Sequence, residues 1–213
     1  MAEYDVLDAF EYNIQKAKDL ADAVDMIERG KGTGEWLYQS AEGLAKSPPL
    51  SEVIESVAPF TGRIESGFNE CIDRVERSGL EASIVMAVTA FETYLRDKYV
   101  EKKQPSEDDK SKLRSFMNLE YVKERYKEVD IKDLIDKTTE QKLKKILPMR
   151  HVIVHKAGII DEKACKMAGW DKSAIGNNIK KFLNYATTTD AISVIEDFIR
   201  DLDKKTTEHV SLL

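Results

Sequence analysis

Apolar residues recur at steps of three and four along most of this chain, and this spacing limits its possible folds more than any other feature. Residues so spaced fall on one face of an α-helix, which can then pack against a core. The first such set is Val6, Leu7, Phe10, Ile14, Ala17, Leu20, Val24 and Ile27. Strand-like alternation extends no further than Val152-Ile153-Val154, and the 213 residues include only five prolines. The pattern therefore predicts an all-α protein.

Glycine and proline mark the expected helix ends in the first half of the chain. The glycine-rich segment 30–34 is expected to end the first helix, and a short helix over 36–45 is expected to stop at Ser47-Pro48-Pro49. Ser78-Gly79 is expected to form a joint before the most apolar segment. That segment predicts a central core helix over about 80–103.

The second half of the chain predicts several shorter helices and one long final helix. Ser106, followed by three acidic residues, predicts a capped helix start. The expected helices cover 110–116, 119–128, 131–136, 139–157, 161–167, 173–185 and a last helix capped by 187–190. Pro148 lies inside the 139–157 segment, so either one helix is kinked there or a new helix starts at this proline. The core face of the last helix is expected to hold Ala191, Ile195, Phe198 and Leu202.

These patterns divide the chain into three expected regions. Residues 1–76 form an N-terminal helical extension packed on the core, residues 77–206 form the helical core domain, and residues 207–213 form a polar tail.

Charge and cysteine content bear on the expected compartment and ligands. The net charge is −6, so any nucleic-acid binding has to rest on a local basic surface. Cys71 and Cys165 lack metal-ligand spacing and are expected to be buried thiols. With no secretory signal pattern and no apolar window long enough for a bilayer, a cytoplasmic protein is expected, with no membrane partner. Trp36 and Trp170 are interpreted as packing or interface anchors rather than base-stacking platforms.

Two of the three histidines lie beside an arginine, in the sequence Arg150-His151-Val152-Ile153-Val154-His155. An imidazole titrates near neutral pH and suits general acid–base work, while a guanidinium grips phosphate. An imidazole and a guanidinium are together the types of group needed to cleave RNA without a metal ion. His151 and His155 have the spacing of a helical zinc pair, but a third ligand is missing from the motif, so no metal and no cofactor is expected. Ordinary surface histidines, with Arg150 as a structural ion-pair partner, are the alternative.

The surroundings of the motif are basic. The segment 142–156 has no acidic residue, and its basic side chains are Lys142, Lys144, Lys145, Arg150 and Lys156. In an acidic protein this stretch would attract phosphate, and we expect Lys145 and Lys156 to contact RNA. Because a helix turns roughly 100° per residue, Arg150 and His155 lie on different faces, whereas His151 and His155 share one. Two copies of the chain facing each other across a twofold axis would bring both groups to one phosphate.

The segment from Arg150 to Gly158 resembles the signature of HEPN domains, which is an arginine, a polar residue and, after a short spacer, a histidine. The segment from Ser83 to Asp97 is similar to the long core helix of the RiboL-PSP and MAE-type branches of that superfamily. The resemblance covers about 75–202 and leaves the N-terminal third without a counterpart.

The resemblance implies a HEPN-like helical bundle that forms a homodimer with a composite site. It implies a metal-independent endoribonuclease that leaves a 2′,3′-cyclic phosphate, in a toxin or antiviral defence role, with an antitoxin or regulatory protein as a possible partner. Arg150 would be the phosphate-binding cation, His155 the acid/base and His151 an assisting group. Glu92 would hold Arg150 or His155 in position, although a simple helix pair with Arg96 is an equal alternative.

Two other functions fit the same sequence. A non-catalytic HEPN module would bind RNA or nucleotides, or serve as a scaffold for a partner protein. A plain helical interaction protein would have no nucleic-acid ligand. Fold class alone does not separate these functions, because function lies in the site.

Overall fold

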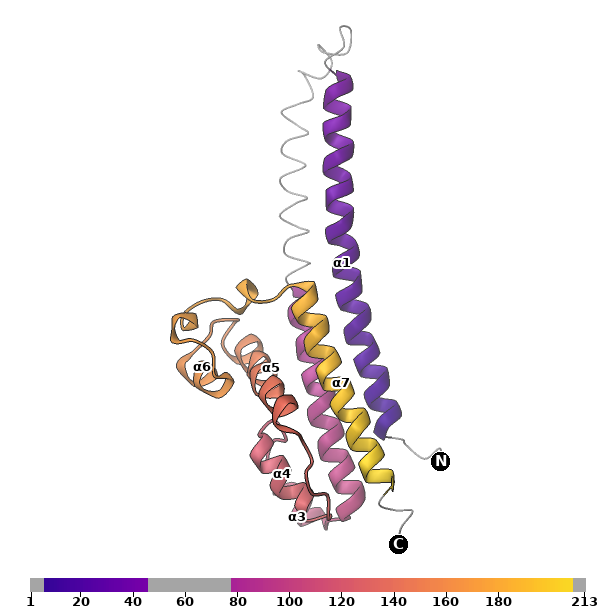
Figure 1. Ribbon diagram of the computed structural model, residues 1–213, viewed down its shortest axis with the longest axis vertical. Coiled ribbons are helices and arrows are strands. Elements are labelled where there is room, and N and C mark those ends of the chain that lie inside the picture. Colours follow the sequence, from indigo (N-terminus) through magenta and orange to yellow (C-terminus); the bar gives the residue numbers. More distant parts are fainter. Residues whose placement is uncertain (1–5, 46–77, 209–213) are drawn as a thin grey trace.

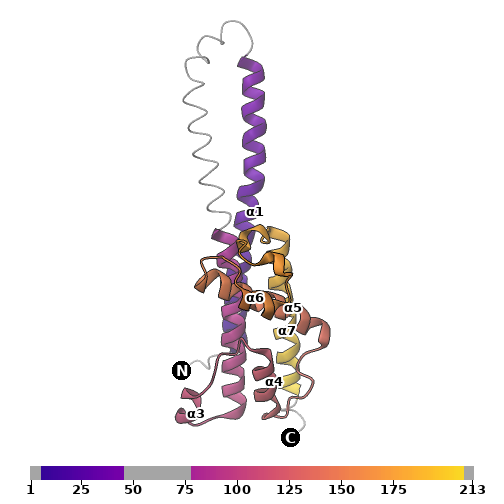
Figure 2. The same ribbon diagram turned by 90° about the vertical axis from the view of Figure 1, so that its left-hand side faces the viewer.

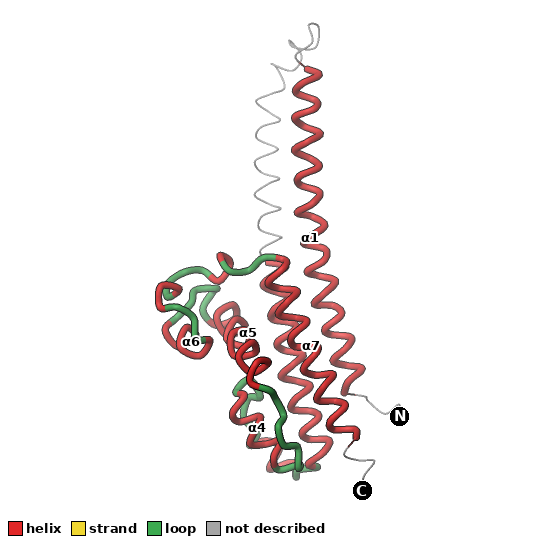
Figure 3. Tube along the Cα trace, in the orientation of Figure 1, coloured by secondary structure: helices red, strands yellow, loops and turns green. Residues whose placement is uncertain are grey.

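A computed structural model describes residues 6–45 and 78–208 and confirms the all-α fold. Three long helical segments lie side by side: α1 (Val6–Ala45), the segment 78–103 and α7 (Tyr185–Glu208) (Figure 1). The second half of α1 continues well past the start of α7. Within the described ranges the tube in Figure 3 contains no strand, and only an isolated bridge joins Ile159 to Asn178.

The main core lies between the long helices, because each of them presents an apolar face. The 78–103 segment buries Ile84, Val88, Phe91 and Leu95, all at helical spacing. The predicted face of α7 is confirmed, since Ala191, Ile195, Phe198 and Leu202 are all buried. Aromatic rings join the layers: Phe10 of α1 meets Tyr94 at 5.5 Å and Phe91 meets Phe198 at 5.7 Å between ring centroids.

Polar pairs tie the long helices together at the edge of this core. Lys98 is 8% exposed, and its Nζ lies 3.2 Å from Asp203 Oδ1, which also accepts a 2.8 Å hydrogen bond from Tyr94 Oη. Burial next to that carboxylate raises the pKa of Tyr94 well above its ordinary value, so the phenol stays protonated. Between α1 and α7, Lys18 pairs with Glu196 across 178 positions of sequence.

Shorter helices cover the other side of the bundle (Figure 2). They are α3 (Glu107–Ser111), α4 (Leu119–Lys127), α5 (Lys137–His155), α6 (Glu162–Ala168), and the 3-10 turns η1 (Lys172–Ala174) and η2 (Ile179–Lys181). Side-chain oxygens of Ser106, Asn118, Asp136 and Asp161 accept hydrogen bonds from the first free N–H groups of α3, α4, α5 and α6. A second, smaller apolar cluster joins α5 to the segment 160–179 and contains Val152, Ile160, Ala164, Cys165, Ala174 and Ile179. Cys165 is 3% exposed, as expected.

Several predicted boundaries in the first half of the chain are wrong. The first helix does not stop at 30–34, since α1 continues through this segment and takes in the separate helix expected over 36–45. Each of the three glycines in this segment costs a helix only about 1 kcal/mol relative to alanine, so a glycine-rich segment does not by itself end a helix. Ser78 and Gly79 already belong to the helical segment 78–103. The predicted break at Pro48-Pro49, the residue Cys71 and the polar end of the tail lie outside the described residues.

Other predictions fail in the second half. The helix start predicted at Ser106 is confirmed, but this helix, α3, ends at Ser111 and does not extend over the expected 110–116, and segment 131–136 is not helical. The helix expected over 173–185 is replaced by η1 and η2. The last helix begins at Tyr185, because Asn184 Oδ1 accepts a 2.8 Å hydrogen bond from Thr187 N. At Pro148 the alternatives are resolved, since α5 is one helix that contains this proline.

Candidate functional site

Helix α5 carries the Arg–His motif in its last two turns. Its N-terminus is fixed by Asp136 Oδ1, which accepts hydrogen bonds from Thr138 N at 2.8 Å and Thr139 N at 3.0 Å. Its inner face is anchored by the buried side chains of Leu143, Ile146, Leu147, Pro148 and Val152. The helix ends at His155, because Ala157 and Gly158 have φ values of +49° and +81°. Gly158 N then donates to Val152 O at 3.0 Å, so the chain turns sharply just after His155.

Arg150 is held by the central helical segment 78–103. Its Nε donates a 3.0 Å hydrogen bond to Thr89 Oγ1, and Thr89 in turn donates to Val85 O at 2.6 Å. Arg150 Nη1 lies 4.0 Å from Glu92 Oε2, and the side chain of Arg150 is 27% exposed. The guanidinium is therefore anchored through Nε, while its Nη groups keep donors for a ligand.

Glu92 faces Arg150 rather than Arg96. Its Oε1 accepts a hydrogen bond from Ser115 Oγ, whose oxygen accepts from Met117 N at 3.2 Å. Arg96 Nε instead lies 3.2 Å from Asp97 Oδ1. The simple Glu92–Arg96 helix pair is thus not formed, and Glu92 links the Ser115 loop to the arginine of the motif.

His151 lies between α5 and the start of α6. Its Nε2 is buried, has no hydrogen-bond partner among the described residues, and lies 3.9 Å from Asp161 Oδ2. The Asp161 carboxylate caps α6 by accepting from Ala164 N at 2.7 Å and lies 3.3 Å from Lys156 Nζ. The Ala164 N–H, and then the Lys156 ammonium, hold the pKa of Asp161 below its ordinary value. His151 therefore has an ionised carboxylate close to its buried nitrogen.

His155 is the exposed member of the motif. Its ring centroid lies 5.3 Å from that of His151, with the two planes tilted by 48°. Across residues 78–208 it makes no hydrogen bond or ion pair that would occupy its ring nitrogens. An imidazole in this position can reach a substrate and exchange protons with it.

The structure thus assembles two neighbouring groups. One contains Arg150, Thr89, Glu92 and Ser115, and the other contains His151, His155, Lys156 and Asp161. No hydrogen bond or ion pair joins the two groups within the described part of the chain. Arg150 and His155 share a helix but are not paired with each other.

The basic stretch is partly neutralised by acidic side chains from elsewhere. Lys144 pairs with Glu140 and lies 3.7 Å from Glu120 Oε1, and Lys156 pairs with Asp161. Lys145 is exposed and forms no ion pair with any described residue. The positive field expected from the sequence is therefore smaller, and among the described residues Lys142 and Lys145 are its exposed lysines without an ion pair.

Sequence reasoning missed three residues of the site: Thr89, Ser115 and Asp161. Asp161 carried a signal, because an aspartate before a short helix is a typical cap. Thr89 and Ser115 carried none, since each comes from a different element and meets the motif only in the folded chain.

The described residues contain no group of three or more histidine, cysteine, aspartate or glutamate side chains placed to hold a metal ion. None of the described helices is both long and apolar enough to span a bilayer. Comparisons of the chain with protein-family models, with curated proteins and with solved structures give no match. The resemblance to HEPN domains therefore rests on the motif and the central helix alone.

Proposed function

We propose that this protein is a metal-independent endoribonuclease of the HEPN type that acts as a homodimer. The observation that carries the proposal is the contrast between two side chains of α5. Arg150 is half-buried and anchored by Thr89, whereas His155 is exposed with its ring nitrogens free among the described residues. A fixed cation and a free imidazole are the kinds of group that phosphodiester cleavage needs.

The proposed reaction is transesterification. A histidine takes the proton of the ribose 2′-OH, and the 2′-oxygen attacks phosphorus. The bond to the 5′-oxygen breaks, and that oxygen receives a proton from a second group. The products are a 2′,3′-cyclic phosphate and a 5′-hydroxyl, and the Arg150 guanidinium stabilises the negative charge that develops on the phosphoryl oxygens.

This chemistry supports the dimer. It needs one group to accept a proton and another to donate one, while His151 Nε2 is buried beside Asp161. Each described chain thus offers one exposed imidazole, and a second copy would supply the other. We assign His151 the role of positioning His155, and Glu92 that of positioning Arg150. In this proposal the enzyme acts on cytoplasmic RNA in a toxin or defence role, under a regulatory partner.

The test is RNA cleavage in EDTA by wild type, His155→Ala and Gln141→Ala, purified side by side. Gln141 is an exposed residue of α5 two turns before the motif, so its variant is the matched control. We expect wild type and Gln141→Ala to leave cyclic-phosphate ends. His155→Ala should lose about 10²- to 10⁴-fold in rate, the usual contribution of a general acid–base group.

Equal activity of wild type and His155→Ala would point to a contaminating nuclease and reject the assigned site. A pure, dimeric preparation that cleaves none of the RNAs tested would reject the proposed ribonuclease activity.

A binding or scaffold module is the second candidate function, and one observation favours it. Most of the exposed large apolar side chains of the described residues lie on one segment: Val154, Ile159, Met167, Ile175 and Phe182. Surfaces that bind a partner often expose apolar side chains of this size, so this stretch of the described chain suits a partner best. RNA binding that survives His155→Ala, with no cleavage by either protein, would support this function over the first.

A further inference from the structure

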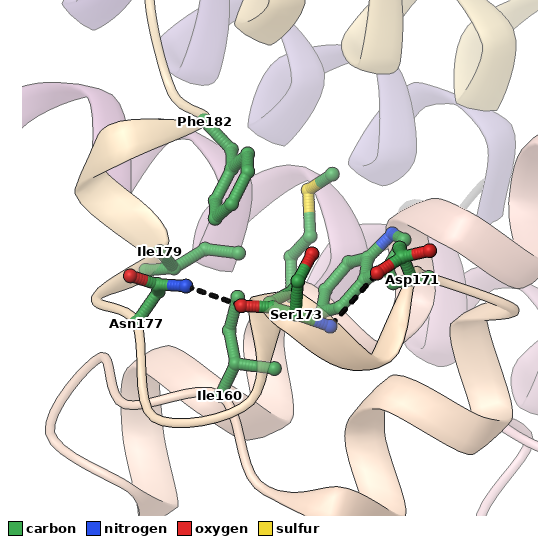
Figure 4. A pocket seen from close by; sticks show the side chains of 9 residues that line it. Ile160, Asp171, Ser173, Asn177, Ile179 and Phe182 are labelled. Atoms are coloured by element: carbon green, nitrogen blue, oxygen red, sulfur yellow. Dashed lines mark hydrogen bonds between the residues drawn. The ribbon is translucent and has the colours of Figure 1, made fainter.

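A small pocket lies in the lobe that α6, η1 and η2 form against α5. Its volume is about 260 Å³, below the roughly 300 Å³ at which pockets for drug-sized ligands begin. Its walls include Met149, Ile160, Trp170, Ser173, Ile179 and Phe182. In Figure 4 the side chains of Phe182, Ile179 and Ile160 point toward one space beside Ser173. The size and lining suit a single flat ring system.

The walls of this pocket are fixed by main-chain hydrogen bonds. Ile160 N donates to Asn177 O at 3.0 Å, Gly176 N donates to Ile160 O at 2.9 Å, and Ile179 N donates to Gly158 O at 2.7 Å. The thiol of the buried Cys165 lies 3.2 Å from the carbonyl oxygen of Trp170. The pocket is thus formed before a ligand arrives, which lowers the entropic cost of binding.

Among the polar groups at the pocket, the Asp171 carboxylate favours a ligand that donates hydrogen bonds. The Asn177 amide is already used, because it donates to Ser173 O at 2.7 Å and accepts from Lys181 Nζ at 2.9 Å. Asp171 Oδ1 accepts from Ser173 N at 2.8 Å, and this serine holds the pKa of Asp171 below its ordinary value. The ionised carboxylate is an acceptor only and keeps further lone-pair sites. The ligand should therefore carry N–H groups at its edge.

Two residues that line the pocket are sequence neighbours of residues in the candidate site. Met149 directly precedes Arg150, and Ile160 directly precedes Asp161, the carboxylate next to His151. Phe182 is 47% exposed, so its ring is open to stacking. Bases of single-stranded RNA are commonly bound by stacking on aromatic rings with hydrogen bonds at their edges.

We propose that this pocket binds one nucleobase of the RNA, and that it prefers bases with an amino group (guanine, adenine or cytosine), which carries two N–H donors, over uracil, whose base edge carries only N3–H. Phe182 and Trp170 contact the faces of the base, and Asp171 accepts from its amino group. The RNA origin of this base rests on the proposed function, whereas binding of the base itself can be tested without cleavage.

The experiment uses the full chain with Trp36→Phe, which leaves Trp170 as the sole tryptophan. Trp170 fluorescence is titrated with GMP, AMP, CMP and UMP, and with ribose 5-phosphate as a ligand that lacks a base. We expect saturable quenching, of millimolar order, by the three amino-bearing nucleotides, weaker quenching by UMP and none by ribose 5-phosphate.

Three variants in this background test the residues. Phe182→Ala should weaken binding about 5- to 100-fold, as expected for loss of one stacking partner. Asp171→Asn keeps a side chain that can cap η1 but should remove the preference for amino-bearing bases. Ile175→Ala, at another exposed apolar residue of the same loop, should bind like its parent.

The pocket proposal is overturned by no saturable quenching with any nucleotide, by equal quenching with ribose 5-phosphate, or by full binding in Phe182→Ala. RNA cleavage by the same preparations separates the two proposals. Nucleotide binding without cleavage would keep the pocket and remove the ribonuclease. His155-dependent cleavage without nucleotide binding would do the reverse.

Discussion

Glu140 connects α5 to α4 and offers a test that needs no knowledge of function. Its Oε2 lies 2.6 Å from Lys123 Nζ on α4, and its Oε1 pairs with Lys144 one turn along α5. The Lys123 ammonium, and then that of Lys144, lower the pKa of Glu140 from 4.5 to about 2. The ionised carboxylate therefore stabilises the folded chain, and we predict that Glu140→Gln is less stable at neutral pH.

The size of the effect follows from this change in pKa. Each pKa unit corresponds to about 1.4 kcal/mol, so the full change would correspond to roughly 3 kcal/mol. Solvent reduces this value, since the side chains of Lys123 and Lys144 are 24% and 46% exposed. We therefore expect Glu140→Gln to lower the free energy of unfolding by about 1 kcal/mol at pH 7.

Urea unfolding over a range of pH measures the effect. Because the pKa is lower in the folded chain, the stabilisation is complete above pH 4.5 and is lost as pH falls toward 2. The difference between wild type and Glu140→Gln should therefore shrink over this range. Glu124→Gln is the control, since Glu124 is exposed and pairs with no described residue. A difference that stays constant down to pH 2, or an equal loss in Glu124→Gln, would refute the reasoning.

Three further predictions follow from single contacts. Thr89→Val removes the acceptor of Arg150 Nε–H, so kcat/KM for RNA cleavage should fall about fivefold, the equivalent of about 1 kcal/mol. Thr89→Ser keeps the hydroxyl and should restore the wild-type kcat/KM. An unchanged kcat/KM in Thr89→Val would show that this contact does not position Arg150. Tyr126→Phe removes the 2.8 Å hydrogen bond from the buried phenol to Leu95 O and should cost about 1 kcal/mol in urea unfolding. Leu143→Ala removes a side chain with no exposed surface and should cost about 2–5 kcal/mol by the same measurement, so a loss below 1 kcal/mol would contradict its place in the core.

The parts of the fold that can be predicted from sequence are those in which a single apolar face of a helix determines how that helix packs. Ile195 and Phe198 could be placed in the core because a long helix repeats its apolar face over many turns. Segment 173–185 was mispredicted because Ile175, Ile179 and Phe182 recur at helical spacing. There, long-range hydrogen bonds such as Ile179 N to Gly158 O outweigh local helix preference. The start of α7 was misplaced for a related reason, since Asn184 competes with the following threonines as a cap.

The candidate site likewise contains residues that can be predicted from the sequence and residues that cannot. Arg150 and His155 stand out in sequence because they are close in the chain and have chemically distinctive side chains. Their supports could not be found in this way, since Thr89 and Ser115 are common polar residues from distant segments. The pocket also could not be predicted from the sequence. Trp170 is expected from the sequence only to pack or to anchor an interface, whereas in the structure it also lines this pocket.

The pairing of α1 with α7 has a consequence for the synthesis of the protein on the ribosome. Lys18 is synthesised 178 residues before its partner Glu196. At about 5–20 residues per second, Lys18 is therefore without this partner for on the order of ten to forty seconds. Throughout this interval Phe10 and Ile14 lack the α7 side of their eventual core. A nascent chain truncated before residue 185 should accordingly bind chaperones that recognise apolar helices, whereas the full-length chain should release them once α7 has left the exit tunnel.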